Sequence, residues 1–250
     1  LLVGIYEKLN YLELALDRMN NLDRNNIYFY KFLKMKLSIF DQLEMKKEAI
    51  EELKNLTKLY PNNPKIIVLL ADRLRANKSF VEAIKHYSDL LKLTNKSERW
   101  GIFYSRGIAY EQSGQWKEGE KDLLTALELN PKDPYILNYL GYSWLDRNKN
   151  IKKALGLLET AVEIEPGDAY IVDSLGWAYY LSGSLEKSVF YLEKAVSLLP
   201  NDATLNDHLG DAYWKIGRKK EAISQWKRVL IFDPNFKKKE IIKKKITNGL

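Results

Sequence analysis

A period of about 34 residues is the feature that most constrains how this 250-residue sequence can fold. Glycine recurs on this period at Gly107, Gly141, Gly176 and Gly210. Three residues after each of them stands an aromatic residue: Tyr110, Trp144, Tyr179 and Tyr213. Proline keeps the same spacing at Pro131, Pro166, Pro200 and Pro234. Self-similarity of this length indicates stacked copies of one supersecondary unit.

Each period predicts two amphipathic helices joined by a short turn. In the first, apolar residues recur at i, i+3, i+4 and i+7, for example Leu137, Leu140, Gly141 and Trp144. Asp133 is a good N-cap, and Pro134 suits the first helical position. The second helix has Ala154, Leu158 and Ala161 on one side and ends before Pro166. Small residues at Gly141 and Ala154 would let the two antiparallel helices approach closely.

This pattern resembles the tetratricopeptide repeat. In residues 169–202 the positions of the family motif hold Val172, Leu175, Gly176, Tyr179, Ser188, Leu192, Ala195 and Pro200. The match is strong over residues 100–236 and weaker upstream. The resemblance implies an all-α fold, a right-handed superhelix, or solenoid, of antiparallel helix pairs. The C-terminal half is also similar to uncharacterised bacterial envelope-associated proteins with such repeats.

We expect one solenoid over residues 1–250. The expected repeats are 1–29 (partial), 30–63, 64–99, 100–133, 134–168, 169–202 and 203–236, followed by a capping helix at 237–250. The repeat at 134–168 carries one extra residue, which we place in its inter-helix turn. The capping helix would have an apolar side formed by Phe236, Ile241, Ile242 and Ile246. A terminal repeat needs such a cap because its outer face is otherwise open.

The positive charge of the chain lies mostly in this tail. The net charge is +7, and residues 235–250 carry six lysines against Glu240 alone, a balance of +5 that leaves +2 for residues 1–234. A nucleic-acid-binding surface would need basic residues spread over a face, so nucleic acid is disfavoured as a partner. The lysine-rich helix is either a solvated cap or a contact for an acidic partner, a nucleic acid or a membrane surface.

The composition excludes several classes of function and leaves the compartment open. Cysteine is absent, which removes disulfides, thiolate nucleophiles and cysteine-ligated metals, and the two histidines are too few for a histidine-rich metal centre. No apolar stretch is long enough to cross a bilayer. Residues 1–5 contain neither an initiator methionine nor a basic leader, so we expect the chain to begin inside a larger protein. A bacterial cytoplasm and a periplasm or cell envelope both fit.

The family resemblance places a binding surface on the concave side of the solenoid, lined by fixed positions of each first helix. The candidate groove residues in this chain are Tyr104, Asn138, Tyr142, Asp173, Trp177, Tyr180, Asp207, Asp211 and Trp214. Aromatic side chains are frequent anchors of interfaces, and carboxylates would favour a ligand with lysine or arginine. The expected partner is therefore a protein or peptide with basic and apolar groups. An alternative is that Trp177 and Tyr180 pack against the neighbouring repeat.

Two specialised functions are disfavoured by particular residues. The clamp by which related proteins grip chaperone carboxylates needs lysine where this chain has Asp173 and Asp207, and asparagine or arginine where it has Ser174 and His208. Asp207, His208 and Asp211 could hold a metal or act as a general base, but a third ligand and a nucleophile are missing. We expect them to form a polar face that is solvated or lines the groove. The sequence therefore predicts no catalytic residue, no metal site and no cofactor.

The function that we expect is a non-catalytic scaffold for protein–protein interaction. One alternative is the repeat region of a larger enzyme whose catalytic domain lies outside these residues. Another is a self-association module that acts through the open ends of the solenoid.

Overall fold

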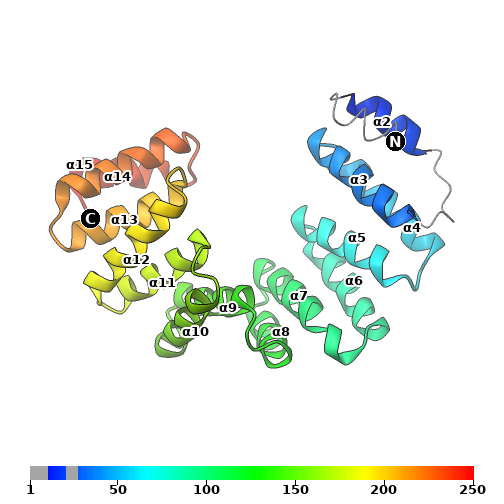
Figure 1. Ribbon diagram of the computed structural model, residues 1–250, viewed down its shortest axis with the longest axis horizontal. Coiled ribbons are helices and arrows are strands. Elements are labelled where there is room, and N and C mark those ends of the chain that lie inside the picture. Colours follow the sequence, from blue (N-terminus) through cyan, green and yellow to red (C-terminus); the bar gives the residue numbers. More distant parts are fainter. Residues whose placement is uncertain (1–10, 21–27) are drawn as a thin grey trace. The chain divides into compact units, whose positions relative to one another are not determined.

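Every regular element in the computed structural model, which describes residues 11–20 and 28–250, is a helix. The predicted all-α class of repeated helix pairs is confirmed. Close contacts divide the chain into two compact units, residues 1–119 and 120–250, with the boundary inside one helix. Figure 1 shows the helices of each unit following one another in chain order. The predicted partial repeat at 1–29 lies largely outside the described residues, and the assignment of the whole chain to one solenoid stays a prediction.

The N-terminal unit contains consecutive helices that pack against their neighbours in sequence. They are α2 (Leu12–Asn20), α3 (Phe29–Gln42), α4 (Lys46–Leu59), α5 (Pro64–Ala76), α6 (Phe80–Leu93), the 3₁₀ helix η1 (Lys96–Glu98), α7 (Trp100–Gln112) and the start of α8 (Trp116–Leu129). Helices α3 to α7 share an apolar core that includes Leu37, Leu53, Leu70, Leu74 and Tyr87, and the buried residues of α2 form a separate cluster with Ile39.

The C-terminal unit continues from Glu120 within α8 and contains three complete helix pairs. They are α9 (Pro134–Asp146) with α10 (Ile151–Ile164), α11 (Ala169–Leu181) with α12 (Leu185–Leu198), and α13 (Ala203–Lys215) with α14 (Lys219–Phe232). The final helix, α15 (Lys239–Asn248), packs against α14. The first helices are also neighbours of one another, because α11 contacts both α9 and α13.

Local sequence signals set where these helices begin and turn. Asp133 caps α9 as predicted, its Oδ1 accepting hydrogen bonds from the backbone N–H groups of Tyr135 and Ile136, each at 3.0 Å. The turn inside each pair holds one residue in the left-handed region, at Glu44, Lys78, Gly114, Asn148, Gly183 and Gly217. The glycines suit that conformation. The α9–α10 turn has a second such residue, Asn150, which accommodates the extra residue of this repeat.

Small residues let the two helices of a pair come close, as the sequence indicates. A Cβ atom added at Gly141 would lie 3.0 Å from Leu158 Cγ and 3.2 Å from the carbonyl oxygen of Ala154. At Gly176 the added atom would lie 2.7 Å from Leu192 Cγ and 3.0 Å from the Leu192 backbone nitrogen. A side chain at Gly176 would therefore force α11 and α12 to shift, whereas at Gly141 the neighbouring Leu158 would have to move by only a few tenths of an ångström.

Only part of the expected apolar side of α15 faces the protein. Ile242 is fully buried and Ile246 is half-buried, but Ile241 is 52% exposed, so its assignment to the packed side is wrong. The helix is rotated so that Ile242, Lys245, Ile246 and Gly249 form its inner face. Within the described ranges, no helix combines the length and apolar character that crossing a membrane requires.

Candidate binding face of the C-terminal unit

Aspartate caps fix the register of the two helices that carry most of the candidate residues. Asp168 Oδ1 accepts from the backbone N–H groups of Tyr170 and Ile171, and Asp202 Oδ1 does the same for Thr204 and Leu205. Residues at i, i+4 and i+7 of a helix share one face. On α11 this face holds Asp173, Trp177 and Tyr180, and on α13 it holds Asp207, Asp211 and Trp214.

His208 connects α13 to α11. Its Nδ1 lies 2.9 Å from Oδ2 and 3.1 Å from Oδ1 of Asp173. The imidazole stacks on the indole of Trp177 with ring centroids 4.2 Å apart. The same indole stacks on Tyr180 with centroids 4.6 Å apart. We name this set the acidic–aromatic cluster: Asp173, Trp177, Tyr180, Asp207, His208 and Asp211.

The two carboxylates of α13 hold a lysine from the last helix. Lys245 Nζ lies 2.6 Å from Asp207 Oδ1 and 2.6 Å from Asp211 Oδ1. Trp226 of α14 donates from Nε1 to Asp211 Oδ1 at 3.0 Å, and its ring centroid lies 5.8 Å from Lys245 Nζ. The ammonium group is therefore enclosed by two anions and the face of an indole, which attracts cations.

These contacts exclude a solvated polar face, which is one of the two arrangements expected for Asp207, His208 and Asp211. Asp207 is 5% exposed and Asp211 and His208 are each 7% exposed. They are buried because α11 lies beside α13 and because α15 covers the end of α13. Asp173 is thus paired with His208, and Asp207 and Asp211 are paired with Lys245, all of the same chain. A basic partner would have to compete with these groups for them.

The electrostatics follow from this burial. Burial raises the pKa of Asp211, and Asp207 raises it further, while Lys245 and Trp226 oppose the rise. Burial also raises the pKa of Tyr180, to about 12, with added contributions from Asp211 and Asp207. For His208, burial alone would lower the pKa, but Asp173, together with Asp207 and Asp211, outweighs it and raises the pKa.

The remaining candidate residues lie around or apart from this cluster. Tyr142 on α9 is 36% exposed, and its pKa is raised by burial and by nearby Asp173. Asn138 on α9 has a buried Oδ1 that accepts no hydrogen bond within the described part of the chain. Trp214 packs against Trp226 with centroids 5.5 Å apart. Tyr104 lies on α7 of the N-terminal unit, so it belongs to a different body from the cluster.

We expect the pairing of His208 to make stability depend on pH. A raised pKa in the folded state means that the protonated histidine stabilises the fold. This contribution is complete below the unfolded-state pKa of about 6.5 and is lost as the pH rises through the higher folded-state pKa. The groups facing the imidazole are Asp173 from α11 and Asp207 and Asp211 from its own helix, and Lys245 of α15 contacts the last two. Urea denaturation of the wild type and His208→Gln between pH 6 and 9 should show the difference in unfolding free energy shrinking with pH.

The other histidine of the chain is the matched control. Burial lowers the pKa of His86 in the N-terminal unit. Its contribution to stability should therefore grow as the pH rises, so His86→Gln should show the opposite slope. Equal slopes for the two variants would contradict the role assigned to Asp173.

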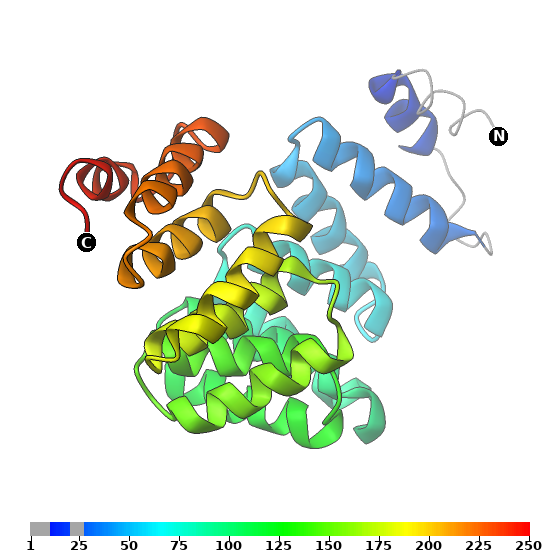
Figure 2. The same ribbon diagram turned by 60° about the vertical axis from the view of Figure 1, so that its left-hand side comes forward.

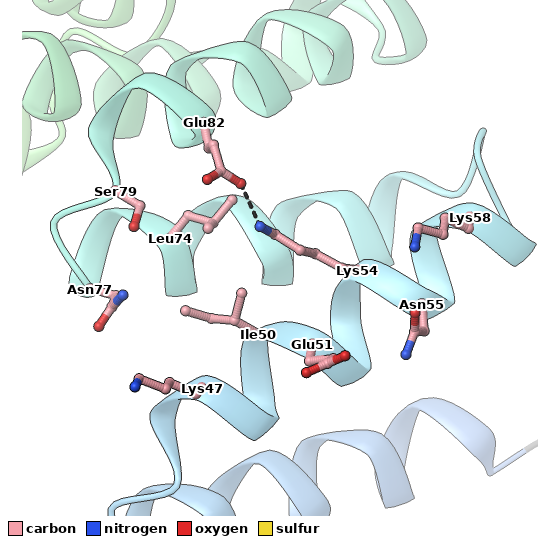
Figure 3. Close-up of a pocket in the computed structure, with 10 residues that line it drawn as sticks. All are labelled: Lys47, Ile50, Glu51, Lys54, Asn55, Lys58, Leu74, Asn77, Ser79 and Glu82. Atoms are coloured by element: carbon pink, nitrogen blue, oxygen red, sulfur yellow. Dashed lines mark ion pairs between the residues drawn. The ribbon is translucent and has the colours of Figure 1, made fainter.

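A concave feature lies in the N-terminal unit, between α4, α5 and α6. Its volume is about 400 Å³, and the Lys54 Nζ–Glu82 Oε2 ion pair crosses it at 2.6 Å (Figure 3). Its lining residues are Lys47, Ile50, Glu51, Lys54, Asn55, Lys58, Leu74, Asn77, Ser79 and Glu82. The positive charges of its lysines and the negative charges of its glutamates nearly balance, so the lining of this pocket does not indicate a class of ligand. Among the residues that the structure describes, no group of three or more potential ligands is arranged to hold a metal ion.

Sequence reasoning missed Lys245, Trp226 and the partner of His208. A signal was present in the spacing, because Lys245 follows Asp211 by 34 residues and His208 follows Asp173 by 35, each about one repeat. Opposite charges one repeat apart on first helices can meet when successive first helices are neighbours. The net charge of the lysine-rich tail does not indicate which of its lysines pairs with Asp211.

Comparison with known proteins agrees with this architecture. Profiles of the tetratricopeptide repeat match residues 104–169, 171–202 and 203–236, together just over half of the chain. The TPR repeat-containing protein MJ1428 of Methanocaldococcus jannaschii is 28% identical over 138 residues. That alignment covers 55% of this chain and 21% of the relative, so the chain spans about a fifth of its length.

Two solved structures illustrate the likeness in fold. The structure of the APC/C hetero-tetramer Cut9–Hcn1 matches with a TM-score of 0.78 and 17% identity, over 96% of this chain and 46% of that chain. YrrB, described as a TPR protein with an unusual peptide-binding site, matches with a TM-score of 0.57 and 19% identity, over 78% of this chain and all of that one. At these identities the likeness concerns the fold alone. With its repeats matched by the family profiles over more than half of its length, the chain belongs to the tetratricopeptide repeat family.

Proposed function

We propose that this chain is a non-catalytic scaffold that binds a segment of a partner protein on the face formed by α9 and α11, next to the acidic–aromatic cluster. Repeats of this family serve in general as protein-interaction scaffolds, and the likeness to YrrB, whose title names a peptide-binding site, supports the same use here. A partner that carries both apolar and basic groups suits this face best.

The observation that carries the proposal is a set of exposed tyrosines on these two helices. Tyr135 and Tyr170 occupy the same position in successive repeats and are 51% and 55% exposed, and Tyr142 is 36% exposed. Exposed aromatic side chains provide contact area at a small cost in conformational entropy and are common interface anchors. The acidic–aromatic cluster beneath them is held by hydrogen bonds and stacking, so the face is preorganised.

The test begins with a peptide library displayed on phage and selected on the immobilised chain. The dissociation constants of selected peptides are then measured by calorimetry. Tyr142→Ala and Trp177→Ala should each weaken binding by roughly 1–3 kcal/mol, the scale of an interface anchor. Trp177→Ala should lower the unfolding free energy less than Leu175→Ala, which removes a fully buried side chain and should cost about 2–5 kcal/mol.

Phe190→Ala supplies the matched control. Phe190 is 63% exposed but lies on α12, a second helix outside the proposed face. This variant should bind the selected peptides as the wild type does. If no peptide is enriched, or if all three aromatic substitutions weaken binding equally, the proposed face is wrong.

A further inference from the structure

The last helix covers every candidate groove position of the last repeat. Lys245 contacts Asp207 and Asp211, and Gly249 lies so close to the Trp214 ring that a side chain there would overlap it. Figure 2 shows the red helix α15 beside the orange helix α14 at the end of the unit, consistent with their contacts. The candidate groove residues of α13 are therefore covered by a segment of the chain itself.

The way in which α15 is held resembles ligand recognition more than core packing. Helix α13 buries ten of its residues, whereas α15 has one, Ile242. Two lysines of α15, Lys243 and Lys244, are exposed, and no side chain caps its first turn. A helix with so little buried surface opens locally at a small free-energy cost.

The surface beneath α15 requires a cation whenever it is covered. Asp207 and Asp211 are both buried one helical turn apart, and removing one partner of a buried ion pair leaves an uncompensated charge. Lys245 Nζ supplies three donors, which reach Asp207 Oδ1 and both oxygens of Asp211. The neighbouring Trp226 ring adds a face that favours an ammonium group.

We propose that this surface, formed by Asp207, Asp211, Trp214 and Trp226, is a docking site for a lysine-bearing amphipathic helix of a partner protein, and that α15 is the resident occupant that such a helix displaces. The partner helix would need the pattern that α15 presents at Ile242, Lys245, Ile246 and Gly249. That pattern is an apolar residue, a lysine three positions later, a second apolar residue directly after the lysine, and a glycine three positions after that. This inference rests on the proposed function, because it assigns a partner and a regulatory segment to the repeat next to the proposed binding face.

The probe is a fluorescein-labelled peptide of residues 236–250, titrated into the full chain and followed by anisotropy. In the wild type, the resident helix competes at a high effective concentration and weakens the apparent affinity. Lys245→Glu in the chain repels α15 from the two aspartates, so the peptide should bind at least tenfold more tightly. The chain with Ile242→Ala, in which α15 is loosened without a change of charge, should also bind the peptide more tightly than the wild-type chain does.

The matched control is Lys244→Glu, the same charge change on the exposed side of α15, which should bind like the wild type. A peptide with Lys245→Ala should bind the Lys245→Glu chain at least tenfold more weakly than the native peptide. Circular dichroism should show that each variant keeps its helical content. The proposal is overturned if Lys245→Glu and Lys244→Glu bind the peptide equally, or if the altered peptide binds as well as the native one. The phage-selected peptides test the proposed function separately, so either result can fail alone.

Discussion

Replacing Trp226 with alanine should lower the unfolding free energy of the protein by about 3–5 kcal/mol, the usual cost of removing a buried tryptophan. Trp226 is fully buried and packs against Gly210 and Trp214. The substitution leaves a cavity between α13 and α14 and removes the donor to Asp211. Chemical denaturation followed by far-ultraviolet circular dichroism measures the change without relying on tryptophan fluorescence.

Two further variants separate packing from hydrogen bonding at this position. Trp226→Phe keeps most of the aromatic contact but loses the N–H group that donates to Asp211. Its loss of unfolding free energy should therefore be well below that of Trp226→Ala and should reflect the hydrogen bond that Asp211 no longer accepts. Phe190→Ala, at a mostly exposed aromatic position, should change stability by no more than about 0.5 kcal/mol. A loss at Trp226 no larger than that at Phe190 would contradict its place in the core.

Substituting leucine for Gly176 should destabilise the protein by about 3 kcal/mol, at the upper end of the usual cost of overpacking. Even a Cβ atom at this position would meet the side chain and the backbone of Leu192, so the whole α11–α12 pair must open to admit it. The better helix propensity of leucine recovers only about 1 kcal/mol. The shift in the denaturation midpoint provides the measurement.

Gly156 offers the control for this substitution. It lies within α10, and an added Cβ atom would meet nothing within 4 Å. Gly156→Leu should therefore be neutral or stabilising by up to about 1 kcal/mol, since only helix propensity changes. A Gly176→Leu protein as stable as Gly156→Leu would show that the close approach of α11 and α12 is not needed.

Features that depend on local sequence could be predicted from it. Asp133 caps its helix, Gly114 and Asn148 turn the chain, and Gly141 meets Ala154, because each depends on neighbours within one repeat. The left-handed turn residues Glu44 and Lys78 could not be recognised in the same way. Neither residue type favours that conformation, so the surrounding helices must impose it.

The pairing of charges in the acidic–aromatic cluster could not be predicted in the same way. The sequence places Asp173, Asp207 and Asp211 on one side of their helices, which predicts a side that is free to attract a basic ligand. Whether a carboxylate is free depends on which group of the next helix faces it. His208 and Lys245 take those places, and the rotation of α15 that brings Lys245 inward also turns Ile241 outward.

The close approach of the helices at Gly141, Gly176 and Gly210 also determines whether one repeat could replace another. The residue facing the glycine is Leu158 in one pair, Leu192 in the next and Trp226 in the last. The second helix of each pair therefore places a side chain of a different shape against the glycine of the first helix. Transplanting α14 into the place of α12 would bring an indole to a gap shaped for a leucine, so the helices of each pair must change together when repeats are recombined.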